Sequence, residues 1–173
     1  MIKKDLSRIT FDATEKNVMS IINLVWEMEK TANSSQQQVI KKYTQGMCND
    51  LTSLINYFIP ESQVGLIVTF EDNGVEYRAY HFMIKLPISD QEPTKYNYYD
   101  INGKWSEDQI KPYCAKILNN VTPDDVFVCG ANFALSKRPR TNNMVINRCV
   151  ELIEKHPNIV INNLASQSAP TRK

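Results

Sequence analysis

Residues 64–83 read VGLIVTFEDNGVEYRAYHFM, and this stretch decides the fold. Two runs rich in β-branched and aromatic residues flank Asn73-Gly74, a residue pair that favours a type I′ turn between antiparallel strands. A two-residue loop fixes the register, and the facing pairs are then Phe70 with Tyr77, Val68 with Ala79 and Leu66 with His81. The sequence therefore predicts a β-hairpin whose core face includes His81.

A second Asn-Gly pair, Asn102-Gly103, predicts another tight hairpin in the same sheet. Ser106 and Gln109 have the spacing of a capping box, which predicts a helix that runs to about Asn119. Because Pro112 lies inside this helix, we expect the helix to bend there or to start late.

The first 60 residues have the periodicity of amphipathic helices. Thr14 is a suitable N-cap, and apolar residues recur at three- and four-residue steps over residues 18–26. The polar segment 32–35 interrupts the pattern, and a second apolar stripe covers residues 39–58, ahead of Pro60. We predict two helices that form an antiparallel pair.

The C-terminal third predicts a strand, a loop, a helix and a second strand. The first strand covers residues 126–129 and extends as far as Leu135, and the basic loop 136–140 leads to a helix that ends at His156-Pro157. Residues 159–161 form the second strand, an order that is compatible with a right-handed crossover between parallel strands.

The predicted fold class is therefore α+β. We expect an N-terminal antiparallel helix pair packed on a mostly antiparallel sheet, with a C-terminal β-loop-α-β unit. The composition favours one globular domain over residues 1–164 and a flexible tail over residues 165–173.

Composition and motifs exclude several function classes. The chain has 173 residues, and no apolar run approaches the roughly 20 residues that a membrane span needs. The N-terminus lacks the apolar core of a signal peptide, so we expect a cytoplasmic protein, in its own cell or in a host. The four cysteines lie at least fifteen positions apart, which favours reduced thiols over zinc ligands or disulfides. No P-loop or dinucleotide fingerprint is present, and we expect no metal and no cofactor.

Charge is unevenly distributed along the chain. Residues 1–60, 61–125 and 126–173 carry net charges of +1, −5 and +5. One interpretation is internal complementarity between the acidic middle and the basic end. The other is a basic patch for an acidic partner or for phosphate.

The basic loop is the candidate anion site. A loop that leaves a strand and enters a helix N-terminus presents unpaired amides and a positive dipole to a ligand. A solvated loop is the simpler interpretation. The candidate anion-binding residues are Lys137, Arg138, Arg140, Thr141, Asn142 and Arg148.

Aromatic residues gather around the second hairpin. They are candidates for a protein interface, for a surface on which bases stack, or simply for core packing between strand and helix. The candidate interface residues are Tyr96, Tyr98, Tyr99 and Trp105.

The first functional hypothesis is a small non-enzymatic binding protein, such as an inhibitor, an immunity protein or a viral or phage accessory factor that acts on a host. It would act through a charge-segregated, aromatic-containing surface on another protein, with a second copy of the chain as an alternative partner.

Two alternatives remain open. One is a module that recognises phosphate in a nucleotide or nucleic acid at residues 136–143. The other is an enzyme that uses Cys129, or His81 with a carboxylate such as Asp100, since catalytic residues scattered in sequence can converge in space.

Overall fold

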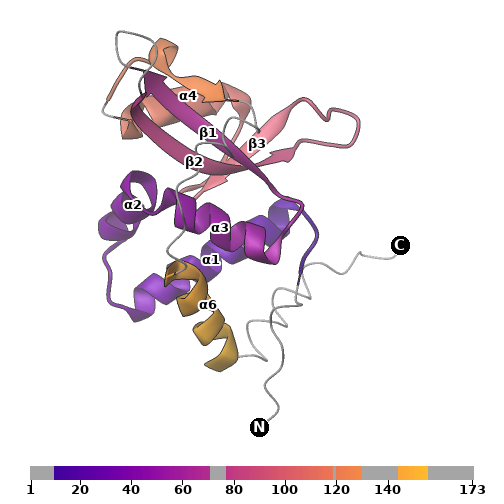
Figure 1. Cartoon of the computed structure of the whole chain (residues 1–173), viewed down its shortest axis with the longest axis vertical. Coiled ribbons are helices and arrows are strands. Elements are labelled where there is room, and N and C mark those ends of the chain that lie inside the picture. The colour runs from indigo at the N-terminus through magenta and orange to yellow at the C-terminus, as the bar shows by residue number, and fades with distance from the viewer. Residues whose placement is uncertain (1–9, 71–76, 119, 130–143, 156–173) are drawn as a thin grey trace.

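The structure is a computed structural model, and it describes residues 10–70, 77–118, 120–129 and 144–155. Helices α1, α2 and α3 form a layer on one face of a β-sheet, and α4 covers the other face (Figure 1). Helix α6 packs against α1 and α3. The helices are α1 (Glu15–Thr31), α2 (Gln36–Gln45), α3 (Cys48–Phe58), α4 (Glu107–Ile117) and α6 (Met144–Lys155).

The described strands form one antiparallel sheet in the order β4-β3-β2-β1-β5. Neighbours in the sheet are therefore joined by short hairpins, apart from β5, which returns to pair with β1 after α4 and the 3-10 turn η2 (Pro123–Asp125). This confirms the α+β class, with helices that precede an antiparallel sheet. The strands are β1 (Gln63–Phe70), β2 (Tyr77–Pro87), β3 (Tyr96–Asp100), β4 (Gly103–Trp105) and β5 (Phe127–Cys129).

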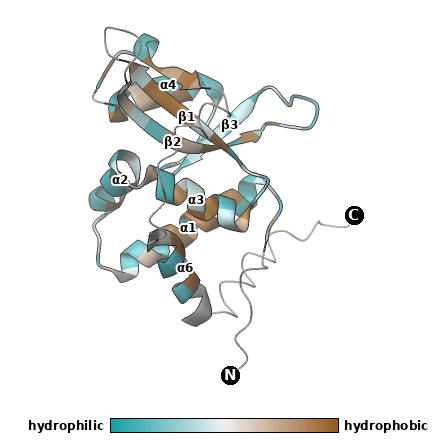
Figure 2. Ribbon diagram, viewed as in Figure 1, coloured by the Kyte–Doolittle hydropathy of each residue, from teal (hydrophilic) through white to brown (hydrophobic). Residues whose placement is uncertain are grey.

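Both faces of the sheet are buried. Val64, Leu66 and Val68 of β1 pack in a core with α1, α3 and α6, whereas Ile67 packs in a second core with α4. Since successive side chains of a strand point to opposite faces, the uninterrupted apolar run of β1 belongs to a strand that is covered on both sides. Figure 2 shows hydrophobic residues along β1 and on the neighbouring parts of α1 and α3.

The helical layer contains one more helix than the sequence predicts. Thr14 caps α1 as expected, because its side-chain oxygen accepts a hydrogen bond from the Asn17 backbone at 3.2 Å. The prediction of a single second helix is wrong: α2 ends before Gly46, and α3 begins at Cys48. Glycine is a weak helix former, and the common apolar stripe allows both short helices to face the same core. The break gives Cys48 a helix N-terminus.

The predicted register of the first hairpin is wrong beyond its first pair. Phe70 pairs with Tyr77 as predicted, but Thr69 pairs with Ala79, which leaves Arg78 without a partner. This β-bulge shifts β2 by one residue, and His81 lies opposite Ile67 instead of Leu66. His81 is buried as predicted, yet on the face that α4 covers.

Other local predictions are confirmed. Asp100 pairs with Gly103, whose φ of 109° suits the tight turn between β3 and β4. Ser106 and Gln109 form the capping box of α4, which continues through Pro112. The predicted turn at Asn73-Gly74 lies outside the described residues.

Several predictions for the C-terminal third also fall outside the described residues. They are the continuation of the strand to Leu135, the basic loop, the strand at 159–161 and the tail. Within the described part, β5 is antiparallel to its neighbour β1.

Candidate active site

Three elements bring a thiol, an imidazole and a carboxylate together beside the central strand β2, at the point where its neighbour β3 ends. Cys48 is the first residue of α3, His81 lies in β2, and Asp100 is the last residue of β3. Because β3 ends at Asp100 while β2 extends past it, the β2 edge around His81 is open to the helical layer. Cys48 reaches this edge, where the backbone N–H of Phe82 donates to its sulfur.

The Asp100 carboxylate is held by four donors. Its Oδ2 lies 3.0 Å from His81 Nε2 and also accepts a hydrogen bond from the Tyr113 hydroxyl. Its Oδ1 accepts from Trp105 Nε1 at 3.2 Å and from the Asn102 backbone at 2.9 Å. The Trp105 and Tyr113 rings stack with centroids 3.8 Å apart, so β4 and α4 fix the carboxylate together. Asp100 in turn fixes the orientation of the imidazole.

The other ring nitrogen of His81 is not satisfied. Nδ1 is buried and has no aligned hydrogen-bond partner among the described residues. The Cys48 thiol interacts electrostatically with the His81 ring, and no regular hydrogen bond joins it to Nδ1. Burial lowers the pKa of His81, but Asp100 and Cys48 raise it by more, to about 9.

Cys48 is stabilised in its ionised form. Burial raises the pKa of the thiol, whereas contact with His81 and the backbone amides of Phe82 and Asn49 lower it by more, so that its pKa lies below the ordinary value. A helix N-terminus adds a favourable dipole for a thiolate. The side chain of Met47, which precedes α3, makes no cap there.

These residues form a chain of contacts that runs from Cys48 through the His81 ring to Asp100. No group of three metal-binding side chains converges on a point within the described residues. A thiolate, an imidazolium and an orienting acid in this order are the elements of nucleophilic catalysis. Cys48 is 5% exposed, His81 0% and Asp100 1%, so a substrate carbonyl reaches the sulfur only when covering side chains move aside.

The sequence identified part of this site. It predicted His81 with a carboxylate such as Asp100, and the structure brings these two residues together. It did not single out Cys48. The sequence signal that could have indicated Cys48 is Gly46, because a glycine favours the end of one helix there and the next helix begins at Cys48. Cys129, the other candidate, lies partly buried in β5, and burial raises its thiol pKa.

The candidate interface residues divide between core and surface. Tyr98 and Tyr99 are buried, one in each core, whereas Tyr96 and Trp105 are partly exposed. The Tyr96 ring lies under the Lys85 ammonium at 4.2 Å.

Of the candidate anion-binding residues, only Arg148 lies in the described part. Its guanidinium is 3.9 Å from Glu29 Oε1, so a buried carboxylate already faces part of its charge. The predicted anion site is thus untested at Lys137, Arg138, Arg140, Thr141 and Asn142, which lie outside the described residues.

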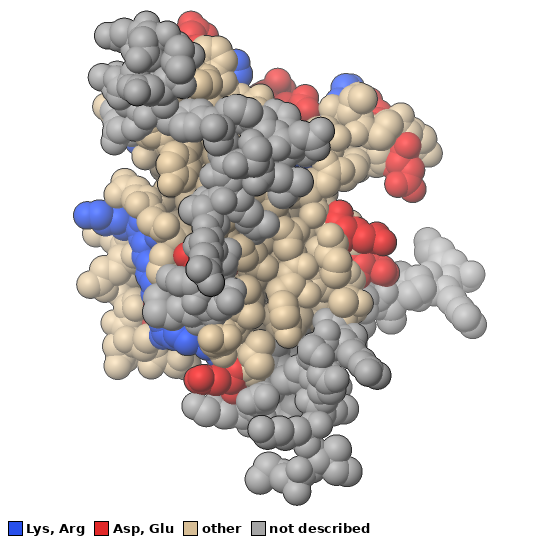
Figure 3. Space-filling view, viewed as in Figure 1, with Lys and Arg blue, Asp and Glu red and all other residues tan. Residues whose placement is uncertain are grey.

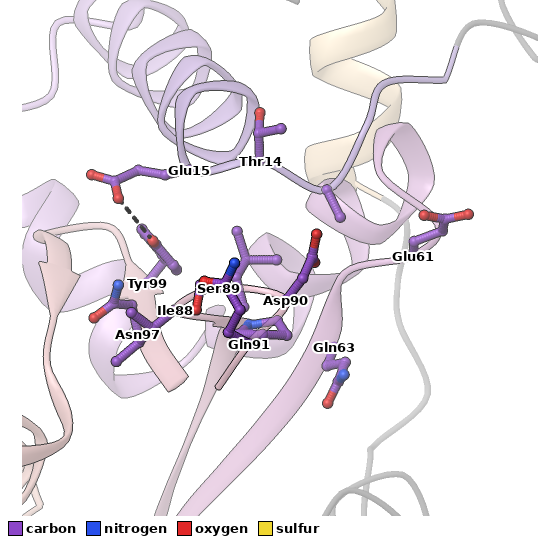
Figure 4. Close-up of a pocket in the computed structure, with 13 residues that line it drawn as sticks. Thr14, Glu15, Glu61, Gln63, Ile88, Ser89, Asp90, Gln91, Asn97 and Tyr99 are labelled. Carbon is purple, nitrogen blue, oxygen red and sulfur yellow. Dashed lines mark hydrogen bonds between the residues drawn. The ribbon is translucent and has the colours of Figure 1, made fainter. Parts of the chain in front are cut away.

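A cavity of about 610 Å³ lies away from the thiol, between the start of α1 and the β2–β3 connection. Figure 4 shows that Glu15, Glu61 and Asp90 contribute acidic groups to its lining, and that Tyr99 donates to Glu15. None of Cys48, His81 and Asp100 lines it.

The surface in Figure 3 separates charges in part. Lys and Arg side chains gather along the side of the helical layer at the left of the view, and Asp and Glu side chains occur on the right-hand side.

No match to this chain is found among protein-family models, curated proteins or solved structures. Among the described helices, none combines the length and apolar composition needed to cross a membrane.

Proposed function

We propose that this protein is a thiol-dependent acyl-transfer enzyme, most simply a hydrolase. Cys48 is the nucleophile, His81 is the general acid and base, and Asp100 orients the imidazole. One observation carries the proposal: Asp100 binds one nitrogen of His81 at 3.0 Å, the other nitrogen has no hydrogen-bond partner, and the Cys48 thiol interacts with the same ring. Nucleophile, base and orienting group are the combination that activates weak nucleophiles in proteins.

The chemistry proceeds in two halves. In acylation, Cys48 Sγ donates an electron pair to the carbonyl carbon of an ester, thioester or amide, and the π electrons move to oxygen. When the carbonyl re-forms, the bond to the leaving group breaks, and the leaving group takes a proton from His81 Nδ1. Water then attacks the thioester and gives its proton to Nδ1, and the C–S electron pair returns to Cys48 as the acid departs.

The helix start supports the same role. The backbone N–H of Cys48 belongs to the first turn of α3, and the amides of a helix's first turn point out of the start of the helix. Such donors stabilise the oxyanion that forms during attack on a carbonyl. The break between α2 and α3 therefore supplies both the thiolate environment and a donor for the transition state.

The test is the pH dependence of alkylation at each cysteine. Iodoacetamide forms an S–C bond with a thiolate as iodide leaves, and peptide mass spectrometry assigns the label. We expect Cys48 to reach half its maximal rate below the pH of about 8.5 that is typical of a free thiol. Cys114 and Cys149 are matched controls, because burial raises their pKa values.

Asp100→Asn should move the Cys48 profile to higher pH, because the amide lacks the charge that raises the pKa of His81. An ordinary thiol profile for Cys48, unchanged by Asp100→Asn, contradicts the proposal.

Protein binding is a second proposal, favoured by two exposed rings. Tyr80 and Phe127 are 48% and 49% exposed, and both flank Val68 in neighbouring strands. Aromatic side chains are enriched in interfaces. Sedimentation of the purified chain tests whether it associates with itself. The double variant Tyr80→Ser with Phe127→Ser should weaken any dimer and so lower the average molecular mass in solution. A wild-type chain that stays monomeric at all concentrations contradicts self-association.

A further inference from the structure

The edge of β2 that faces β3 lacks a partner strand over part of its length, and α3 buries this edge at His81, Phe82 and Met83 while Tyr80 stays exposed. β3 pairs only with Ile84–Pro87, while β2 begins at Tyr77. On its other side, β2 pairs with β1 almost throughout. Among the described residues, no strand covers the β3-facing edge of β2 between Tyr77 and Met83 (Figure 1).

Cys48 uses one backbone donor of this edge. The Phe82 N–H reaches its sulfur, and hence points away from β1. N–H and C=O groups two residues apart point to the same side of a strand, so those of Tyr80 also face the open edge. Among the backbone hydrogen bonds that the described residues make outside the helices and the strand ladders, none involves these two groups. They form a vacant pairing position directly beside the nucleophile.

The side chain at this position is apolar and accessible. The Tyr80 ring is 48% exposed and contacts the Phe82 ring edge-to-face, with centroids 5.7 Å apart. The rise from Tyr80 to Phe82 along a strand is about 6.8 Å. A chain paired with Tyr80 therefore carries its next carbonyl, one or two residues on, to the sulfur of Cys48.

We propose that the acyl donor is an extended polypeptide that pairs through its main chain with Tyr80 at this edge and packs an apolar side chain on the Tyr80 ring. This inference rests on the proposed function and specifies its substrate class. Free backbone donors and acceptors on a strand edge are satisfied by another strand, as in peptide recognition by β-strand addition. Small esters and thioesters lack the main-chain groups to do so.

The test uses peptide electrophiles on the full-length chain. A blocked tripeptide chloromethyl ketone with phenylalanine beside the ketone alkylates Cys48 with loss of chloride. Its counterparts carry an N-methyl group on one of the first two amides, which removes a main-chain donor. We expect at least one methylated probe to react with Cys48 about tenfold more slowly than the unmethylated peptide. Iodoacetamide has no peptide main chain, so its rate reports the reactivity of the thiol alone.

Tyr80→Pro and Tyr80→Ala form a matched pair of variants. Both substitutions remove the ring, and proline also removes an N–H that faces outward, which edge positions tolerate. Tyr80→Pro should slow the peptide probe about tenfold relative to Tyr80→Ala, with equal iodoacetamide rates and equal melting temperatures showing that the fold and thiol are intact.

The possible failures are distinguishable. If Cys48 reacts with iodoacetamide as an activated thiol but the methylated and unmethylated peptides react equally, the docking edge is refuted and the proposed function stands. If Cys48 shows no activation towards any electrophile, the proposed function itself is refuted.

Discussion

Two carboxylates in the described part of the chain are each 1% exposed, and they differ in what surrounds them. Glu29 lies in the helical layer, where its Oε1 accepts from Lys42 Nζ at 2.6 Å and from the Tyr43 hydroxyl at 2.7 Å, and its Oε2 accepts from Ser34 at 3.1 Å. Asp100 is bonded as fully, but one of its partners is His81, which keeps a second nitrogen free of aligned hydrogen bonds.

The difference separates a structural centre from a reactive one. At Glu29, the carboxylate forms an ion pair with Lys42, and this pair links α1 to α2. At Asp100, the network continues through the imidazole to a thiol. A buried polar group without a partner is costly, so such a group in a native fold requires an explanation. In the proposed function, proton transfer during attack by Cys48 gives His81 Nδ1 its role.

The largest expected effect is on the structural centre. Glu29→Gln removes the charge that answers Lys42, while the amide keeps the shape of the side chain. We expect the free energy of unfolding to fall by about 3 kcal/mol, measured by urea denaturation, because breaking a buried ion pair leaves a charge without its partner. The alkylation profile of Cys48 should not change. A shifted profile would mean that the two centres are coupled.

An intermediate effect concerns the pH dependence of stability. The folded pKa of His81, about 9, exceeds its unfolded value, so its stabilisation is complete below about pH 6.5 and disappears as pH rises through 9. The lowered pKa of Cys48 acts in the opposite direction, because its stabilisation grows with pH. The two contributions offset each other in the wild-type chain.

Cys48→Ala removes one side of this balance. Its free energy of unfolding should decline as the pH rises above about 6.5, by up to about 1.4 kcal/mol per pH unit and more steeply than in the wild type. The decline should end below pH 9, because only Asp100 then raises the pKa of His81. Urea denaturation at a series of pH values measures the slope. Cys114→Ala is the control, since burial raises the pKa of this thiol and it stays neutral over most of the range. If the free energy of unfolding has the same pH dependence in the wild type and in Cys48→Ala, the opposing contributions of Cys48 and His81 are contradicted.

The smallest effects compare two hydroxyl groups. Tyr43 donates to Glu29 and Tyr113 donates to Asp100, so Tyr43→Phe and Tyr113→Phe remove equivalent bonds. Each should lower the free energy of unfolding by about 1.5 kcal/mol, the range for a hydrogen bond to a charged group. Only Tyr113→Phe should change the pH profile of Cys48 alkylation. If both variants or neither change it, the contrast between the centres is not supported.

Local rules were enough to predict much of the fold. The cap at Thr14, the box at Ser106 and the hairpin at Asn102-Gly103 depend on residues within a few positions of one another. All three are confirmed, although the loop of the hairpin consists of Ile101 and Asn102. The register of β2 was not predictable in this way, because both of its faces are apolar and alternation does not distinguish them.

Only part of the candidate site was predicted, because local sequence patterns do not show which distant residues come together. His81 and Asp100 were paired as chemical partners from their residue types, but nothing near Cys48 indicates an imidazole 33 positions away. Their approach depends on the end of α2 at Gly46 and on the early end of β3, which are consequences of packing. The anion site predicted at residues 136–143 remains a prediction, outside the described residues.

The unpaired residue Arg78 has a consequence for how this chain tolerates insertions and deletions. If the hairpin paired regularly with the same number of residues, His81 would point towards the helices and Phe82 towards α4. Apolar side chains would still fill both cores, so selection for stability alone would not detect the change. A one-residue slip in this hairpin would therefore produce relatives that keep the architecture and lose the contacts of His81 with Asp100 and Cys48.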